Sequence, residues 1–254
     1  MNGLIAFSKK ELTEQLRSFK ALILMAVLFL FGMMSPLTAK ILPDIFTGMQ
    51  VQGITIIIPA PTAFDAYAQF FKNVGQMGLL VLLLLYGGLL SQDVTKGTLI
   101  VLLAKGLSRS AVIAAKFITS LIVWTAGYAL AAFTAWGYTV YLFGANVVPN
   151  LLPAFFSLWL FGAFLLALLL FASTAAPGNY GGLLVTGTII IVMLILNTFP
   201  IVSKWNPVTL AASSTALLNG SLSTGEMAVT AYLTAGLIVA LVALAIVIFK
   251  KKQL

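Results

Sequence analysis

Cysteine and histidine are absent from this 254-residue sequence, and charged residues make up only 8% of it. Without cysteine the chain can form neither a disulfide nor a thiolate site. The acidic residues number only six, too few and too scattered to build a metal-ligand cluster or to supply a base beside a serine nucleophile. We therefore expect that the protein is not an enzyme and binds no metal or cofactor of its own.

What the sequence has in abundance is apolar side chains, at 61% of residues. Soluble proteins carry roughly 25% charged residues, so this composition indicates a polytopic, all-α membrane protein. About twenty apolar residues cross a bilayer as a helix. The segments of this kind are 21–38, 74–91, 112–143, 154–172, 183–199 and 227–249. We expect six spans in one transmembrane domain over 1–254, with the first run retained as a span because it is too long for a signal peptide.

The positions of lysine and arginine predict the orientation, because cytoplasmic loops are enriched in both. With both termini in the cytoplasm, only Lys40, Lys72 and Lys204 face outward. The cytoplasmic set is Lys9, Lys10, Arg17, Lys20, Lys96, Lys105, Arg109, Lys116, Lys250, Lys251 and Lys252. This distribution explains the net charge of +8 through contact with anionic lipids or a cytosolic partner. Since the chain has no soluble basic domain, we expect no nucleic-acid binding.

Several local signals place helix ends. Thr62 with Asp65, and Ser223 with Glu226, have the spacing of capping boxes at helix starts. The first predicts a helix that begins near Ala63 and runs to about residue 91. Residues 1–20 alternate apolar and charged side chains at helical spacing, which predicts an amphipathic helix in the inner interface. A solvated lead-in is the alternative.

Two outer segments are more complex than turns. Residues 54–58 are β-prone and are followed by Pro59, so an extended segment is expected. Residues 203–225 are rich in small side chains, which fits either a broken, re-entrant helix pair or surface helices at the headgroup level. Both interpretations stay open.

The stretch "SQDVTKGTLIVLLAKGLSRS" (91–110) gathers four charges beside an apolar run, 98–104, that is too short to cross the membrane. Gly97 and Gly106 bracket the run, and Ser108 can cap the next helix. The pattern predicts a short cytoplasmic helix. This helix either sits in a groove of another protein or packs beneath its own bundle.

No carboxylate lies within a predicted span, which argues against an ion-driven pump. A secondary transporter that holds sodium with carbonyls and hydroxyls at a broken helix remains the alternative. The chain also lacks the Gly-x-x-x-x-Gly-Lys-Ser/Thr phosphate loop. If the protein moves a solute uphill, the energy is expected to come from another polypeptide.

Three motifs in order resemble the ABC-2 type permease family, the membrane subunits of small bacterial ABC exporters. The first is "KKEL-x-E-x-x-R", at Lys9, Lys10, Glu11, Leu12, Glu14 and Arg17. The second is an acid followed by "KGTL-x-x-LL-x-K-x-x-SR", at Asp93, Lys96, Gly97, Thr98, Leu99, Leu102, Leu103, Lys105, Ser108 and Arg109. The third is "NP-x-x-L", at Asn206, Pro207 and Leu210. The likeness covers essentially the whole chain.

The resemblance implies that residues 94–107 form a coupling helix, with Asp93 and Arg109 beside it, docked on a separate nucleotide-binding ATPase. It also implies that the N-terminal helix, with Glu11, Glu14 and Arg17, is the connecting helix of that interface. Two ATPase subunits would hold ATP and magnesium, and this chain would pair with a second copy or a sister permease in the bacterial cell membrane. Cargo that is amphipathic (peptide, drug or lipid-like), or sodium, would pass polar and aromatic residues such as Asn197, Thr198, Trp124 and Trp136.

Overall fold

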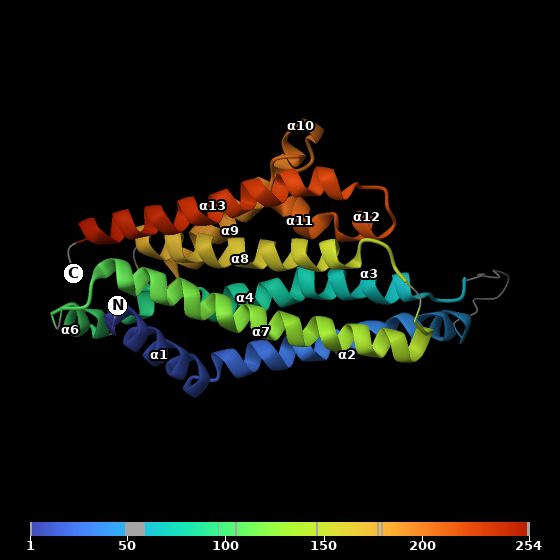
Figure 1. Ribbon diagram of the computed structural model, residues 1–254, viewed down its shortest axis with the longest axis horizontal. Coiled ribbons are helices and arrows are strands. Elements are labelled where there is room, and N and C mark those ends of the chain that lie inside the picture. Colours follow the sequence, from blue (N-terminus) through green and yellow to red (C-terminus); the bar gives the residue numbers. More distant parts are fainter. Residues whose placement is uncertain are drawn as a thin grey trace.

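Long helices lie side by side in an elongated bundle (Figure 1). The computed structural model describes residues 2–48, 59–95, 97–104, 106–145, 147–176, 178 and 180–252. The start of the first helix, the end of the last helix and the short helix α6 lie together at one end of the bundle, which we call the α6 end. The start of α3 lies at the other end, the α3 end.

Helices account for nearly all of the described residues, and no strand occurs among them. In chain order the elements are α1 (Asn2–Arg17), α2 (Lys20–Gly48), α3 (Ala63–Asn73), the π-helix η1 (Val74–Gly78), α4 (Leu79–Tyr86), α5 (Ser91–Thr95), α6 (Thr98–Ala104), α7 (Arg109–Phe143), α8 (Leu151–Ala175), α9 (Gly181–Leu196), α10 (Pro200–Ser203), α11 (Val208–Ala212), α12 (Ser214–Leu218) and α13 (Thr224–Lys251).

Five helical segments in the described part of the chain are long and apolar enough to cross a membrane: 20–43, 63–95, 109–143, 151–175 and 224–251. They confirm an all-helical architecture, and their length and apolar composition fit a membrane-embedded protein. The sixth predicted span, 183–199, is not confirmed at full length, because α9 has 16 residues and ends at Leu196. At 1.5 Å per residue α9 measures about 24 Å, less than the roughly 30 Å of a hydrocarbon core.

The helix of the second span begins where its sequence predicts, but a turn interrupts it before residue 91. Thr62 precedes the helix, and its backbone N–H donates to the Asp65 carboxylate at 2.8 Å. From Ala63 the helix continues through the π-helix to Tyr86, and a turn then leads to α5. The expected continuous helix to residue 91 is therefore wrong, since Gly87 and Gly88 fall in the turn.

The core forms where α8 meets α7, α9 and α13. Trp124 of α7 is fully buried and lies against Gly162 of α8, where an added Cβ would come within 2.3 Å of the indole ring. Tyr128 and Phe155 continue the same contact, with the Tyr128 hydroxyl donating to the Phe155 carbonyl at 2.9 Å. A glycine opposite a tryptophan lets the two helices approach closely, and this sets the position of the long helix α7.

Residues 200–218 contain the three short helices α10, α11 and α12, which fit both interpretations of the segment 203–225. α11 and α12 pack on α8, whereas α10 stands away from the bundle (Figure 1). Asn206 is buried and supports the break, because its amide donates to the Met193 carbonyl at 2.6 Å and accepts from the Val208 N–H at 3.1 Å. The expected extended segment 54–58 lies outside the described residues.

The start of α13 confirms the second capping box. The Glu226 N–H donates to the Ser223 hydroxyl at 3.2 Å, and the Ser223 N–H donates to the Glu226 carboxylate at 3.4 Å. Ser108 caps α7 as expected, accepting from the Ala111 N–H at 3.2 Å. Short polar side chains at these positions satisfy backbone donors that have no partner within the helix.

Candidate functional site

The α6 end is where the two charged motifs of the sequence meet, because α1 packs against α7 close to α5 and α6. On α1, the buried residues Phe7, Glu11 and Gln15 recur every four positions and therefore share one face. Ile5 of α1 is 63% exposed, as is fitting for an apolar side chain at a lipid interface. The inward face of α1 is thus partly polar.

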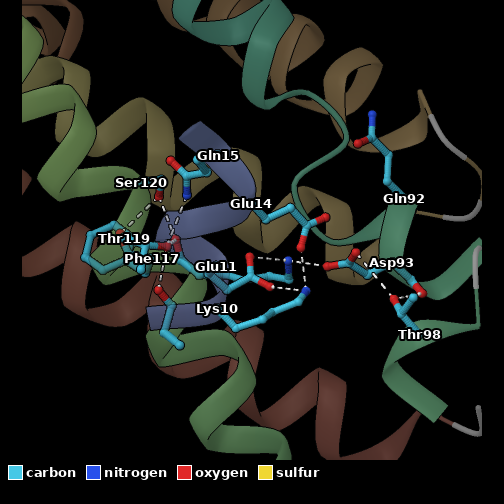
Figure 2. Close-up of polar contacts among 12 residues, drawn as sticks. Lys10, Glu11, Glu14, Gln15, Gln92, Asp93, Thr98, Phe117, Thr119 and Ser120 are labelled. Carbon is cyan, nitrogen blue, oxygen red and sulfur yellow. Dashed lines mark hydrogen bonds and ion pairs between the residues drawn. The ribbon is translucent and has the colours of Figure 1, made fainter. Parts of the chain in front are cut away.

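The polar face of α1 is explained by a buried lysine on α7. The Lys116 ammonium lies 2.9 Å from a Glu11 carboxylate oxygen and also forms an ion pair with Asp93. Their side chains are only 3%, 6% and 9% exposed, respectively. Figure 2 shows the Glu11 and Asp93 carboxylates facing one another across this site. We call Glu11, Asp93 and Lys116 the buried charge cluster.

Burial makes this cluster sensitive to the loss of any member. Removing a charge from water costs several kcal/mol, and close pairing with hydrogen bonds offsets that cost. Lys116 pairs with both carboxylates of the cluster, but Glu11 has a second cation, since the Lys10 ammonium lies 3.2 Å from its other oxygen. Among the described residues, Asp93 forms its ion pair with Lys116 only. Asp93 therefore depends on Lys116 more than Glu11 does.

Lys10 links the cluster to the solvent-facing side of α1. It forms an ion pair with Glu14 at 2.5 Å as well as with Glu11. Burial disfavours its charged form, but the hydrogen bonds and charges of Glu14 and Glu11 outweigh burial and hold the pKa of Lys10 above its ordinary value. Lys10 thus stays protonated at neutral pH.

A neutral hydrogen-bond chain extends the site along α1. The Tyr86 hydroxyl donates to the Gln15 side-chain oxygen at 2.8 Å, and the Gln15 amide donates to the Thr119 hydroxyl at 3.2 Å. These residues belong to α4, α1 and α7, so the amide of one residue joins three helices. Because Tyr86, Gln15 and Thr119 are all buried, their mutual hydrogen bonds fix α1 in one position on the bundle.

Asp93 also connects the cluster to α6. The Thr98 hydroxyl, at the first residue of α6, lies 3.2 Å from the Asp93 carbonyl oxygen and 3.5 Å from a carboxylate oxygen. The other carboxylate oxygen faces Lys116. Asp93 therefore joins the start of α6, mainly through its backbone carbonyl, to the α1–α7 contact, through its carboxylate (Figure 2).

The short helix predicted between Gly97 and Gly106 is present, but it is shorter than the 94–107 segment that the resemblance implies as a coupling helix, since residues 94 and 95 belong to α5. α6 covers Thr98–Ala104, and Gly97 and Gly106 on either side have φ angles of +69° and +89°. Such left-handed backbone favours glycine. Within α6, Leu99 is buried, Leu102 and Leu103 are partly buried, and Ile100 is 50% exposed. Among the large apolar side chains of α6 that the structure describes, Ile100 is the exposed one, and motif matching alone did not select it.

Arg109 contacts the end of α13 and not α6. Its guanidinium donates to the backbone carbonyls of Phe249, Lys250 and Lys252 at 3.1, 2.9 and 2.6 Å. These are among the last carbonyls of α13, where helices leave acceptors unsatisfied. Arg109 thus caps α13 and fixes its end beside the start of α7.

The remaining candidate residues lie apart from the buried charge cluster. Arg17 is exposed at the end of α1, and Lys96 and Lys105 lie outside the described residues. Trp124 donates its indole N–H to the Trp159 carbonyl at 3.0 Å, and Trp136 is 54% exposed. At the end of α9, Asn197 accepts from Thr209 at 2.8 Å, and Thr198 bonds its own helix at Ile195.

Sequence reasoning missed Lys116 as a site residue, although a signal was present. Lys116 is the only charged residue within the predicted span 112–143, and an ionisable side chain inside a span usually has a buried partner. The partner itself was not readable, because Glu11 lies 105 positions away. Gln15 gave no signal, since glutamine on a surface helix is ordinary.

No family model, curated protein or solved structure matches the chain in any of the three comparisons. No group of three or more histidine, cysteine, aspartate or glutamate side chains that could hold a metal occurs among the described residues.

Proposed function

We propose that the protein is the permease subunit of an ATP-driven ABC exporter, with the α6 end as the docking site for a separate nucleotide-binding ATPase. The observation that carries the proposal is the link from α6 through Thr98 and Asp93 to Lys116 on α7 and Glu11 on α1. Two segments that resemble the coupling and connecting helices of ABC-2 permeases are thereby joined by buried charges.

The geometry supports a mechanical role for this link. α7 has 35 residues, about 52 Å of helix, and packs against α1, α2, α3, α8 and α13. A displacement of α6 would act on α7 near its start through the cluster, and α7 contacts most of the bundle along its length. Since packed helices exchange between discrete arrangements, a shift at one end can change the arrangement at the other.

The exposed side chain Ile100 gives α6 an apolar contact for a partner, and Leu99 anchors the helix from the inside. α6 thus packs beneath its own bundle through Leu99, and the exposed Ile100 supports the alternative in which the helix also contacts a partner. In this proposal the two ATPase subunits bind ATP and magnesium and carry out the hydrolysis. The chain lies in the bacterial cell membrane with both termini on the cytoplasmic side.

The test compares two substitutions of isoleucine by glutamate. Ile100→Glu should reduce co-purification of the ATPase at least tenfold, because a charge in a desolvated interface costs more than about 1.4 kcal/mol. Ile201→Glu on α10 is the matched control, since Ile201 is 83% exposed and lies away from the α6 end. The control should co-purify the ATPase normally.

A second variant separates docking from coupling. Thr98→Val keeps the shape of the side chain but removes its bonds to Asp93, so the ATPase should still bind while cargo-dependent ATP hydrolysis falls. Transport by the purified chain alone in liposomes under an ion gradient would contradict the proposal and favour the ion-coupled carrier. Normal ATPase binding by Ile100→Glu would place the docking site elsewhere.

A further inference from the structure

A second candidate site in the described part of the chain is a cavity toward the α3 end, apart from the buried charge cluster. It encloses about 1050 Å³ between α2, α3, η1, α4, α8, α9, α11 and α12. This volume is near the upper end of the roughly 300–1,000 Å³ of small-molecule sites. The cavity is thus large enough for an amphiphile with one acyl chain.

One wall of the cavity carries a row of polar side chains. Asp65, Gln69, Lys72 and Gln76 all line it, and their spacing of four, three and four residues places them on one face of α3 and η1. Asp65 and Lys72 are seven residues apart, which corresponds to about 10 Å along the helix. One small ion cannot contact both, but a head group with separate positive and negative groups can.

The other walls are apolar. Beyond Gln76 the same helix presents Leu79, Leu80 and Leu83 to the cavity, and Phe161 of α8 and Ile190 of α9 face them. From the α3 end inward, a ligand would therefore meet a carboxylate, then an ammonium group, then an apolar surface. Phospholipid-like zwitterions have the matching order: a terminal cation, an inner phosphate and an acyl chain.

The surroundings of the cavity fit entry from the bilayer. Leu42, Leu80 and Leu194 line the cavity and yet are 45%, 51% and 51% exposed. A water-soluble protein would rarely leave such an apolar border uncovered, but in a membrane-spanning chain it contacts lipid. The π-helix lies in the same wall through Gly75 and Gln76, and such single π turns occur frequently at functional sites.

We infer that this cavity binds a single-chain zwitterionic amphiphile, with its cationic group at Asp65, its phosphate at Lys72 and its acyl chain between α4, α8 and α9. As the cargo site of an exporter the inference rests on the proposed function. As a binding site it is independent of any ATPase. The ammonium of Lys72 is exposed and has no hydrogen-bond or ion-pair partner among the described residues, so it is available to a phosphate.

The experiment titrates the purified full chain in neutral detergent with fluorescent lysophosphatidylcholine, and with lysophosphatidylglycerol of the same acyl chain. The wild type should prefer the zwitterion, because only choline supplies a cation for Asp65. Lys72→Gln should weaken binding of lysophosphatidylcholine about tenfold, the effect of losing one charged hydrogen bond. Lys204→Gln is the matched control, because Lys204 is exposed and does not line the cavity.

Two further variants test the orientation of the ligand and the location of the site. Asp65→Asn should reduce the preference for choline over glycerol, whereas Lys72→Gln should weaken both ligands. Ala212→Phe should block both, since Ala212 is exposed and lines the cavity, so a larger side chain projects into it without entering the core. Circular dichroism and thermal unfolding of each variant check that the fold is retained.

Three results would overturn the inference. The first is equal affinity of the wild type for the two lipids, and the second is that Lys204→Gln loses as much affinity for lysophosphatidylcholine as Lys72→Gln. The third is disulfide cross-linking of Leu80→Cys between two chains that proceeds to the same extent with and without lysophosphatidylcholine. The last would show that a second copy covers the cavity. Because the assay contains no ATPase, selective binding with normal ATPase docking by Ile100→Glu would refute the proposed docking site alone. Loss of docking without selective lipid binding would refute the cavity alone.

Discussion

Lys116 is expected to be the residue of the buried charge cluster whose loss costs most stability. Lys116→Met leaves the Glu11 and Asp93 carboxylates, 6% and 9% exposed, facing each other without their shared cation. Breaking a buried ion pair in this way typically costs about 3–5 kcal/mol. Asp93→Asn leaves Lys116 paired with Glu11 at 2.9 Å, and the cost should fall to about 1–3 kcal/mol, that of one unsatisfied polar group.

Double variants make this reasoning sharper. In the Lys116→Met background, Glu11 retains the Lys10 ammonium at 3.2 Å, whereas Asp93 has no other ion-pair partner among the described residues. Adding Asp93→Asn should therefore recover more stability than adding Glu11→Gln. The triple variant, which removes all three charges, should be close to the wild type, as replacement of buried ion pairs by neutral groups often is.

The measurement is the free energy of unfolding from reversible denaturation in mixed micelles, with far-ultraviolet circular dichroism as the probe. Thermal midpoints in the same detergent provide a second readout. Equal stability of Lys116→Met and the wild type would refute the reasoning, because it would show that the cluster is hydrated rather than buried. Greater recovery from Glu11→Gln than from Asp93→Asn would show that Lys10 does not support Glu11.

Two further predictions concern helix packing and helix ends. Gly162→Ala should destabilise the bundle by about 1–3 kcal/mol in the same unfolding assay, because the new methyl group would meet the Trp124 ring. Gly137→Ala is the control, since an added Cβ there meets nothing within 4 Å. An equal loss of stability in the control would contradict the packing argument. Arg109→Met should fray the last turn of α13, since three carbonyls lose their donor. Hydrogen exchange there should rise at least fivefold, which corresponds to a loss of about 1 kcal/mol of local stability. Unchanged exchange would mean that the cap contributes nothing.

Sequence patterns correctly indicated the features that depend on near neighbours along the chain. Ser108 and Ser223 are short polar side chains that satisfy helix-end donors within three residues, and Gly97 and Gly106 adopt left-handed backbone at the ends of α6. The apolar composition likewise indicated a helical membrane protein, since in lipid a helix satisfies its own backbone groups. These features require no knowledge of distant residues.

The choice of which side of a helix faces inward was decided by tertiary structure. Periodicity separated an apolar face from a charged face on α1, but it did not show that Glu11 of the charged face turns inward to Lys116. On α6, the motif included Leu99, which the bundle buries, and passed over Ile100, which it exposes.

Composition and local pattern determined by themselves that this chain is a helical membrane protein and where most of its helices begin. Only the tertiary structure decided that a lysine of α7 is shared by carboxylates of α1 and α5, and that a polar row on α3 faces an apolar wall of α8 and α9. The physical reason is that caps and breaks are satisfied within a few residues, whereas a buried charge or a cavity is defined by side chains far apart in the chain.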